Sequence, residues 1–180
     1  MIKLGHIVYS NCFPVHAGIL KGKIACPFPI VKGIPSELNR ALVEGKIDVS
    51  PSSSIEYATN PGKYRILPGL SITSRNEVMS ILLESRVPLD GLNNKTVALT
   101  TASATSVVLL RVILEIFSGV NPDFMLYEQG VEDPYEQADA VLTIGDLAIK
   151  RTLSPRFPLT YDLGEIWHRH TGLPFVFALW

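Results

Sequence analysis

The chain has 180 residues, of which 47% are hydrophobic and 18% are charged. A chain of this length and apolar content can bury a sizeable core, which excludes an intrinsically disordered protein. The formal net charge is −1 and no basic run occurs, so we expect no nucleic-acid partner. No segment reaches the ~18 consecutive apolar residues that crossing a bilayer requires, so we expect no membrane partner.

The first residues, MIKLGHIVYSNCF, alternate like a strand and lack the long apolar region and the cleavage site of a signal peptide. We therefore expect a cytoplasmic protein in which Cys12 and Cys26 are reduced thiols. The sequence gives no indication of the oligomeric state.

Predicted strands and helices alternate along the chain. The strands are expected at residues 2–9, 24–25, 47–50, 64–67, 77–85, 96–99, 123–127, 140–144, 157–162 and 175–180. Helices are expected after Pro14, after a cap at Ser36, after the serines at 52–54, and at residues 106–117, 147–153 and 164–170. This alternation predicts an α/β fold with mainly parallel sheets.

The most informative stretch is residues 95–117, a predicted strand, loop and helix. The loop at 100–105 contains only hydroxyl and methyl side chains, and Ser103 or Thr105 is expected to cap the helix. Uncharged hydroxyls ahead of free backbone N–H groups at a helix N-terminus suit a carboxylate or phosphate. An ordinary capped turn would have the same sequence, so the pattern alone leaves both interpretations open.

Polar residues recur at four predicted strand ends or helix starts. These clusters are Ser10 with Asn11, the serines Ser52, Ser53 and Ser54, the loop from Ser103 through Thr105 to Ser106, and Gly145 with Asp146. If two lobes face each other, the clusters would line one cleft and recognise a small polar anion. Four unrelated caps would explain the same spacing. Asp146 could bind a substrate hydroxyl, act as an acid or base, or cap a helix.

The sequence predicts neither a metal site nor a bound cofactor. His168 and His170 are two residues apart, so on a helix they point to different faces. His6, His16 and the two cysteines show no zinc-binding spacing. The nucleophile-elbow, phosphate-loop and dinucleotide-binding motifs do not occur in the sequence.

Taken together, several segments resemble the chorismate dehydratases of the futalosine route to menaquinone. They are GHIVYSNCFP (5–14), DVSPSSSIEY (48–57), LPGLSI (67–72) with SILLESRVP (80–88), residues 97–110, IGD (144–146) and DLGEIWHRHTGLPFVFALW (162–180). The likeness covers essentially the whole chain. It implies the fold of type II periplasmic binding proteins, in which two α/β lobes joined by crossover strands close on a ligand.

The resemblance also implies an activity, namely removal of water from chorismate to give 3-[(1-carboxyvinyl)oxy]benzoate without cofactor or metal. The ligand contacts that it implies are Ser10, Asn11, Ser53, Ser54, Thr105, Ser106, Gly145 and Asp146, to which we add Ser103 from the same loop. We therefore expect a small-molecule substrate, chorismate, as the partner of this protein.

Eliminating the ring hydroxyl of chorismate creates an aromatic ring, so the enzyme mainly has to orient the substrate and exclude water. No histidine is among the ligand contacts that the resemblance implies, so we expect none of these contacts to act as a histidine base. Our hypothesis is that the substrate's own side-chain carboxylate takes the ring proton while Asn11 positions the reacting group, with Asp146 as the alternative base. The sister family that makes dihydroxynaphthoate uses a histidine, and Gly145 stands in that place here.

We predict two lobes, residues 1–84 and 85–174, with residues 175–180 crossing back. The sequence ends on an apolar strand, so this strand either returns to the first lobe or is followed by a missing segment that completes it. Two alternatives to the enzyme remain: a non-catalytic binding protein for a small carboxylate, and an inactive truncated form.

Overall fold

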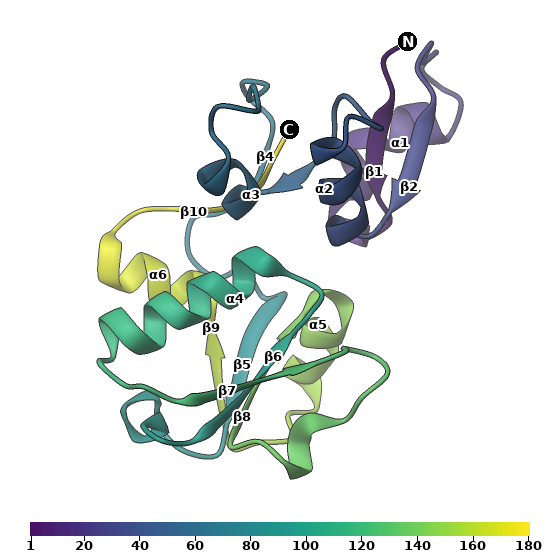
Figure 1. The fold of residues 1–180 in the computed structure, drawn as a ribbon. Coiled ribbons are helices and arrows are strands. Elements are labelled where there is room, and N and C mark those ends of the chain that lie inside the picture. The colour runs from purple at the N-terminus through teal and green to yellow at the C-terminus, as the bar shows by residue number, and fades with distance from the viewer. The chain divides into compact units, whose positions relative to one another are not determined.

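The computed structural model describes residues 1–180, apart from the side chain of Asn11. The strands are β1 (Leu4–Ile7), β2 (Ile30–Gly33), β3 (Ser52–Ser53), β4 (Ser71–Ser74), β5 (Ile81–Ser85), β6 (Thr96–Thr100), β7 (Asp123–Tyr127), β8 (Ala140–Ile144), β9 (Leu159–Asp162) and β10 (Phe175–Leu179). The α-helices are α1 (Phe13–Leu20), α2 (Pro35–Val43), α3 (Ser54–Thr59), α4 (Ala104–Arg111), α5 (Gly145–Leu153) and α6 (Leu163–Thr171) (Figure 1). Short 3-10 turns lie at Ser10–Cys12, Leu89–Leu92 and Pro134–Glu136, and a π-helical turn, Val112–Phe117, continues α4.

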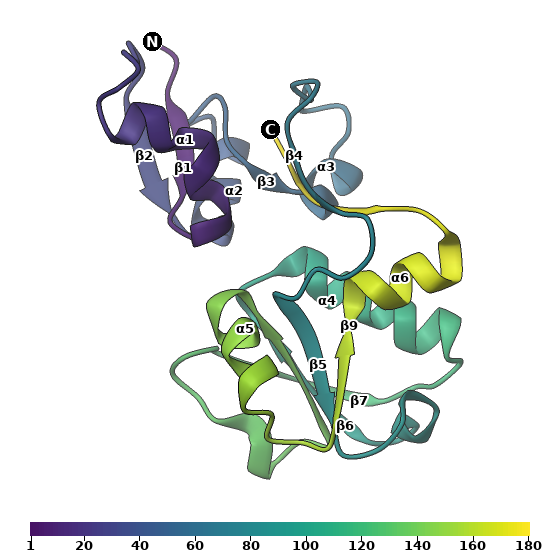
Figure 2. The same cartoon turned by 180° about the vertical axis from the view of Figure 1, so that it is seen from behind.

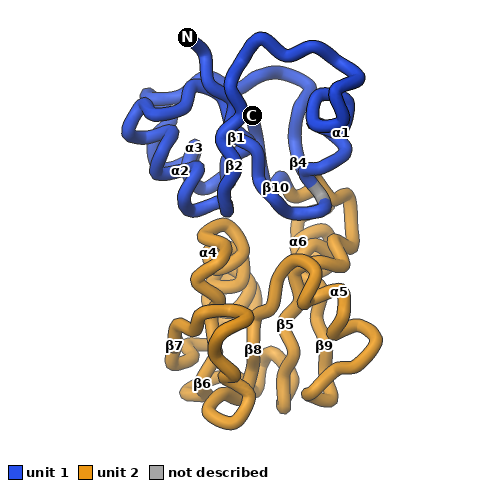
Figure 3. Tube along the Cα trace, turned by 90° about the vertical axis from the view of Figure 1, so that its right-hand side faces the viewer, with its two compact units in different colours: residues 1–72, 176–180 blue, residues 73–175 orange. Residues whose placement is uncertain are grey.

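The chain divides into two compact units (Figure 3). Unit 1 comprises residues 1–72 and 176–180, and unit 2 comprises residues 73–175. The sequence analysis assigned residues 1–84 to the first lobe. In the structure β5 pairs with both β8 and β9, which gives this strand to unit 2.

Unit 2 is built on one sheet with the strand order β7-β6-β8-β5-β9. Strand β6 runs parallel to β7 and β8, whereas β5 runs antiparallel to β8 and β9. The prediction of mainly parallel sheets is therefore correct for the β7-β6-β8 side and wrong for the β5-β9 side. Helices α4 and α6 cover one face of the sheet and α5 covers the other (Figures 1 and 2).

The core of unit 2 follows directly from apolar runs in the sequence. Every residue of β5 and β8 is buried, with Leu83 and Leu142 at 0% exposure. On α4 the predicted apolar face is confirmed at Leu110 and on its continuation at Leu114, both at 0% exposure. The helix begins at Ala104, two residues earlier than predicted.

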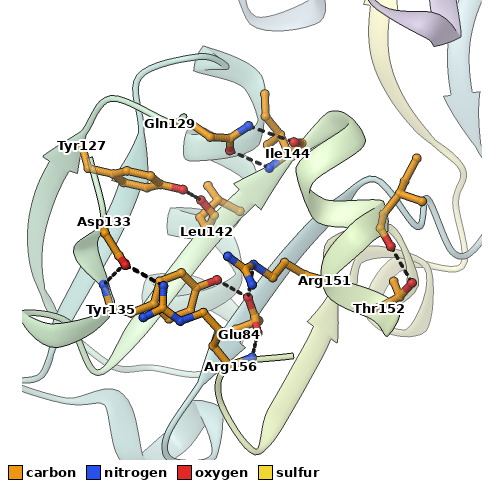
Figure 4. Close-up of polar contacts among 11 residues, drawn as sticks. Glu84, Tyr127, Gln129, Asp133, Tyr135, Leu142, Ile144, Arg151, Thr152 and Arg156 are labelled. Atoms are coloured by element: carbon orange, nitrogen blue, oxygen red, sulfur yellow. Dashed lines mark hydrogen bonds and ion pairs between the residues drawn. The ribbon is translucent and has the colours of Figure 1, made fainter. Parts of the chain in front are cut away.

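Strand β5 also carries a buried charge, Glu84 (Figure 4). The hydroxyl of Tyr135 donates to one carboxylate oxygen, and the backbone N–H of Arg156 donates to the other at 2.6 Å. The Nε atom of Arg151 lies 3.9 Å from the same carboxylate. Burial, and secondarily Glu84, raise the pKa of Tyr135, which keeps its hydroxyl a donor. The charge is therefore compensated by a cation and two hydrogen bonds.

Unit 1 has a smaller sheet arrangement. Strands β1 and β2 pair in parallel, Leu4 forms a parallel bridge with Val49, and β10 pairs antiparallel with β3 in a second sheet ordered β3-β10-β4. The core cluster contains Ile7, Cys12, Leu38 and Ile47.

Four predictions in unit 1 are wrong. Residues 47–50 form no strand, and within them Val49 makes an isolated bridge to Leu4. The second strand lies at Ile30–Gly33 and not at residues 24–25. Residues 64–67 form a loop, in which the N–H of Leu67 donates to the carbonyl of Trp180 at 2.6 Å, so its backbone is satisfied without a neighbouring strand. Helix α2 starts at Pro35 rather than after Ser36, because proline already has a helical φ and the Glu37 carboxylate accepts from the N–H of Ile34 at 3.1 Å.

Candidate functional site

In unit 2, two of the four polar clusters follow neighbouring parallel strands. Strand β6 leads into the loop before α4, and β8 leads directly into α5. The two strands pair in parallel, with Val97 opposite Ala140 and Ala98 opposite Val141. The starts of both helices therefore lie at the same edge of the sheet, which is where open α/β sheets bind ligands.

The loop before α4 is a well-formed cap. Of the two predicted caps, Ser103 and Thr105, the N-cap residue is Ser103. Its Oγ accepts a hydrogen bond from the N–H of Ser106 at 3.2 Å. The two serine Oγ atoms are 2.8 Å apart. Thr105 and Ser106 are buried, at 4% and 1% exposure. Within unit 2 the hydroxyls of Ser103 and Ser106 thus hold each other in place.

The turn from β8 into α5 is held by two contacts that the sequence did not indicate. Gly145 has φ 63°, the left-handed region that favours glycine, and its N–H donates to the carbonyl of Ser80 at 2.7 Å. The side chain of Gln129 bonds to both the N–H and the carbonyl of Ile144, each at 3.0 Å (Figure 4). Asp146 is exposed in the first turn of α5. The structure therefore presents this carboxylate on a fixed turn.

Asp162, which the sequence analysis did not select, supports the same region. Its carboxylate accepts from the N–H groups of Gly164 and Glu165 at the start of α6, at 2.9 and 3.1 Å. It also accepts from the N–H groups of Val78 and Met79, at 3.0 and 2.6 Å. One side chain thus joins a helix start to the segment preceding Ser80, whose carbonyl binds Gly145. The available sequence signal was an aspartate followed by a helical pattern.

In unit 1, the other two clusters also follow strands that run in parallel. Ser10 is exposed at the start of the 3-10 turn after β1. The side chain of Asn11 lies outside the described residues, so its predicted catalytic role stays a prediction. Because Leu4 bridges Val49 in parallel, the segment that continues into Ser52 extends in the same direction as β1. Each unit therefore gathers two polar clusters at strand ends.

The serines after Val49 are organised by Asn39 of α2. The hydroxyl of Ser52 donates to the Oδ1 of Asn39 at 2.7 Å, and the Nδ2 of Asn39 donates to the Oγ of Ser53 at 3.2 Å. Ser54 is the first residue of α3 and is half-buried. Asn39 was missed because an asparagine on a helix face gives no sequence signal of a contact 13 residues away.

Ser52 and Ser53 line a cavity of about 380 Å³ within unit 1. Its polar lining includes Asp48, Ser50, Ser52, Ser53, Tyr57, Lys63 and Arg65. Two cations, one carboxylate and several hydroxyls give this cavity a net positive lining, which suits an anionic ligand.

Among the residues that the structure describes, no group of three or more histidine, cysteine, aspartate or glutamate side chains could hold a metal ion together. None of the described helices has the length and apolar character required to span a membrane.

The fold is that of the periplasmic binding proteins. A solved protein of Archaeoglobus fulgidus matches with a TM-score of 0.74 and 20% identity, covering 99% of this chain and 66% of that one. The periplasmic aliphatic sulphonate binding protein of Escherichia coli matches with a TM-score of 0.57 and 18% identity, covering 99% of this chain and 64% of that one. At such identities the likeness establishes the fold alone.

The sequence comparisons are more specific. The chain belongs to the menaquinone biosynthesis family, whose model matches residues 2–180. It is 36% identical to a chorismate dehydratase of Thermus thermophilus, over 98% of this chain and 68% of the relative. It is 33% identical to a chorismate dehydratase of Campylobacter jejuni, over 97% of this chain and 64% of the relative. The chain thus spans about two thirds of the length of these curated relatives.

Proposed function

We propose that the chain catalyses the dehydration of chorismate to 3-[(1-carboxyvinyl)oxy]benzoate, a carbon–oxygen lyase reaction of menaquinone biosynthesis. The observation that carries the proposal is the similarity to two chorismate dehydratases over 97–98% of the chain. We propose further that the reaction takes place in the cytoplasm and uses no cofactor.

Chorismate carries two carboxylates, and the structure offers features that suit them. In unit 2, α4 is an eight-residue helix that starts at the carboxyl end of β6 behind an uncharged hydroxyl loop. In unit 1, hydroxyls lie near Lys63 and Arg65 around one cavity. Charge-assisted hydrogen bonds from such groups orient an anion without consuming a proton. These observations support substrate contacts at Ser53 and at the loop from Ser103 to Ser106. We also propose contacts at Ser10, which is exposed after β1, and at Ser54, the neighbour of Ser53.

The chemistry places modest demands on the protein. Loss of the ring hydroxyl together with the ring proton yields an aromatic ring, so the substrate supplies much of the driving force and the protein supplies orientation. In the proposed mechanism the substrate's side-chain carboxylate takes the ring proton while Asn11 positions the reacting group. Asp146, exposed on its fixed turn, binds a substrate hydroxyl and is the alternative base.

The direct test is to incubate the purified 180-residue chain with chorismate and follow product by mass. Turnover supports the lyase. A thermal shift with chorismate but no product supports a non-catalytic carboxylate-binding protein instead. The absence of both turnover and a thermal shift supports an inactive form. This outcome is included because the curated relatives are longer than this chain.

Two variants separate the substrate-assisted mechanism from one in which Asp146 is the base. We expect Asn11→Ala to lower kcat about 100-fold, because a misplaced reacting group costs about that factor. We expect Asp146→Asn to keep turnover while raising KM, because the amide still binds a hydroxyl. Full turnover by Asn11→Ala together with loss of turnover by Asp146→Asn would identify Asp146 as the base and refute the substrate-assisted mechanism.

A further inference from the structure

Two histidines that flank the turn at Ser10 and Asn11 are in contact. His6 lies on β1 and His16 on α1, and their Nδ1 atoms are 2.8 Å apart. The side chains are 5% and 9% exposed, and their ring planes meet at 71°. This distance and burial define a hydrogen bond that joins the strand before the turn to the helix after it.

The protons of this pair are constrained. When both rings are neutral, one Nδ1 carries the hydrogen and the other accepts it. A first added proton can go to the free Nε2 of the donor ring, which preserves the hydrogen bond. A second would put hydrogens on both Nδ1 atoms, facing each other across 2.8 Å. The contact therefore survives one positive charge and is lost when both rings are charged.

The surroundings oppose this double charging. Burial lowers the pKa of His16. The pKa of His6 is lowered mainly by burial and further by the positive charges of His16 and Lys32. Lys32 lies directly opposite His6 in the β1–β2 register. Nearby on the turn, burial raises the pKa of the Cys12 thiol to about 11 and also raises the pKa of Tyr9, so both groups stay neutral near pH 7.

The other elements that pack on β1 and α1 contribute apolar or uncharged groups. Helix α2 contributes Leu38 to the cluster with Ile7 and Cys12. From β10 onward the chain contributes Trp180, whose ring centroid lies 6.4 Å from that of His16. Lys32 is thus the charged group that acts on the pair besides the histidines themselves.

We propose that the hydrogen bond between His6 and His16 positions the turn at Ser10 and Asn11 for substrate, and that acid pH opens it. The proposal rests on the proposed function in that this turn contacts chorismate. His6 and His16 act through the turn, so they are positioning residues. The backbone of the turn is itself ordered, since the N–H of Cys12 donates to the carbonyl of Tyr9 at 3.1 Å.

Two substitutions of one residue separate the hydrogen bond from ring packing. His16→Phe keeps an aromatic ring beside His6 and Trp180 but removes the nitrogen. His16→Asn removes the ring but keeps a nitrogen or oxygen close to the Nδ1 position, and this group does not titrate. We expect kcat/KM to fall about tenfold in His16→Phe, the loss typical of one hydrogen bond. We expect His16→Asn to stay within about twofold of the unsubstituted chain.

The dependence of kcat/KM on pH distinguishes a positioning role of the pair from a purely structural one, because only the former predicts different pH profiles for the variants. The kcat/KM of the unsubstituted chain should hold down to about pH 6.5 and fall in more acidic solution, because the pKa values of both histidines lie below the ordinary 6.5 and the contact is lost only when both rings are charged. In His16→Asn the fall should be absent. His168→Asn, on α6 of unit 2, is the matched control and should retain the fall. A fall in His16→Asn equal to that of the unsubstituted chain would overturn the proposal.

A second measurement does not depend on turnover. Imidazole nitrogen NMR near pH 7.5 should show one Nδ1 of the pair with a hydrogen and the other without. Hydrogen exchange at the Cys12 amide should accelerate about tenfold in His16→Phe and remain unchanged in His16→Asn. If no variant turns over chorismate at any pH, the proposed function fails on its own. Equal exchange at Cys12 in all three proteins would then overturn the positioning role separately.

Discussion

The two units differ in how their interiors are filled. Among the described residues, the large side chains of unit 1 with no more than 2% exposure are Leu38 and Ile47, whereas unit 2 buries Leu83, Leu110, Leu142 and several more to that extent. Unit 1 also exposes large apolar side chains, among them Val8, Phe13, Val15, Ile24, Phe28 and Val31. Unit 1 therefore depends on fewer contacts, and each of them carries a larger share of its stability.

The buried polar groups of the two units differ as well. Unit 2 buries Glu84, which accepts hydrogen bonds from the Tyr135 hydroxyl and the Arg156 N–H and forms an ion pair with Arg151. Unit 1 buries two histidines in contact with each other, and burial lowers the pKa of each. We therefore expect mild acid to act on the histidine pair of unit 1, next to the turn that we propose binds substrate.

The largest effect should come from breaking the network of unit 2. We expect Glu84→Leu to lower the free energy of unfolding by about 3–5 kcal/mol, because the Tyr135 hydroxyl and the Arg156 N–H lose their buried acceptor and Arg151 loses its ion-pair partner. Denaturant unfolding measures this. Glu84→Gln is the control and should cost less, since its amide oxygen still accepts. Equal losses in the two variants would show that the charge of Glu84 is unimportant.

A matched pair of leucine substitutions sharpens the comparison of cores. Leu110→Ala in unit 2 should cost about 4 kcal/mol, and Leu38→Ala in unit 1 about 2 kcal/mol, because a less densely surrounded site can collapse around the lost atoms. Amide hydrogen exchange, measured separately for the two units, reports the loss of stability that each substitution causes. A larger loss from Leu38→Ala would contradict the view that unit 1 is less tightly packed.

Mild acid should destabilise unit 1 selectively. The pKa values of His6 and His16 lie below the ordinary histidine value of 6.5 in the folded chain, so the unfolded chain binds protons first as the pH falls. Stability from the pair is therefore fully present above pH 6.5 and is lost as the pH drops below it. Amide exchange in unit 1 should accelerate on acidification while β5 and β8 remain protected. Uniform acceleration in both units would contradict this assignment.

The smallest effect should come from an exposed ion pair. Arg111 Nε lies 2.8 Å from Glu115 Oε1, with side chains 53% and 33% exposed. We expect Glu115→Gln to change the free energy of unfolding by no more than about 0.5 kcal/mol, because water screens such pairs. This variant also serves as a control for Glu84→Leu under the same denaturant conditions.

The sequence predicted those parts of the fold that apolar periodicity determines. Strands β7 and β8 have the predicted bounds, and the helix after β6 has the predicted apolar face. In contrast, residues 77–80 were predicted as strand. The structure has Met79 at φ 61°, held by Asp162 from 83 residues away, and no local pattern encodes that contact.

The candidate site was predictable only in part. Hydroxyls at strand ends indicated where helices start, and Ser103 is a cap as expected. The groups that hold these turns, Gln129, Asn39 and Asp162, come from distant elements and carry no motif. The contact of His6 with His16 was missed for the same reason, since it requires the strand-turn-helix geometry and not a spacing rule.

The central proposal is that the polar clusters at the strand ends bind a small dicarboxylate. A crystal structure of the chain with 3-[(1-carboxyvinyl)oxy]benzoate tests it most directly. We predict that each carboxylate of the ligand contacts one of these clusters, which are Ser10 with Asn11, Ser53 with Ser54, the loop 103–106 and the turn at Gly145. A ligand bound away from all four polar clusters would contradict the account.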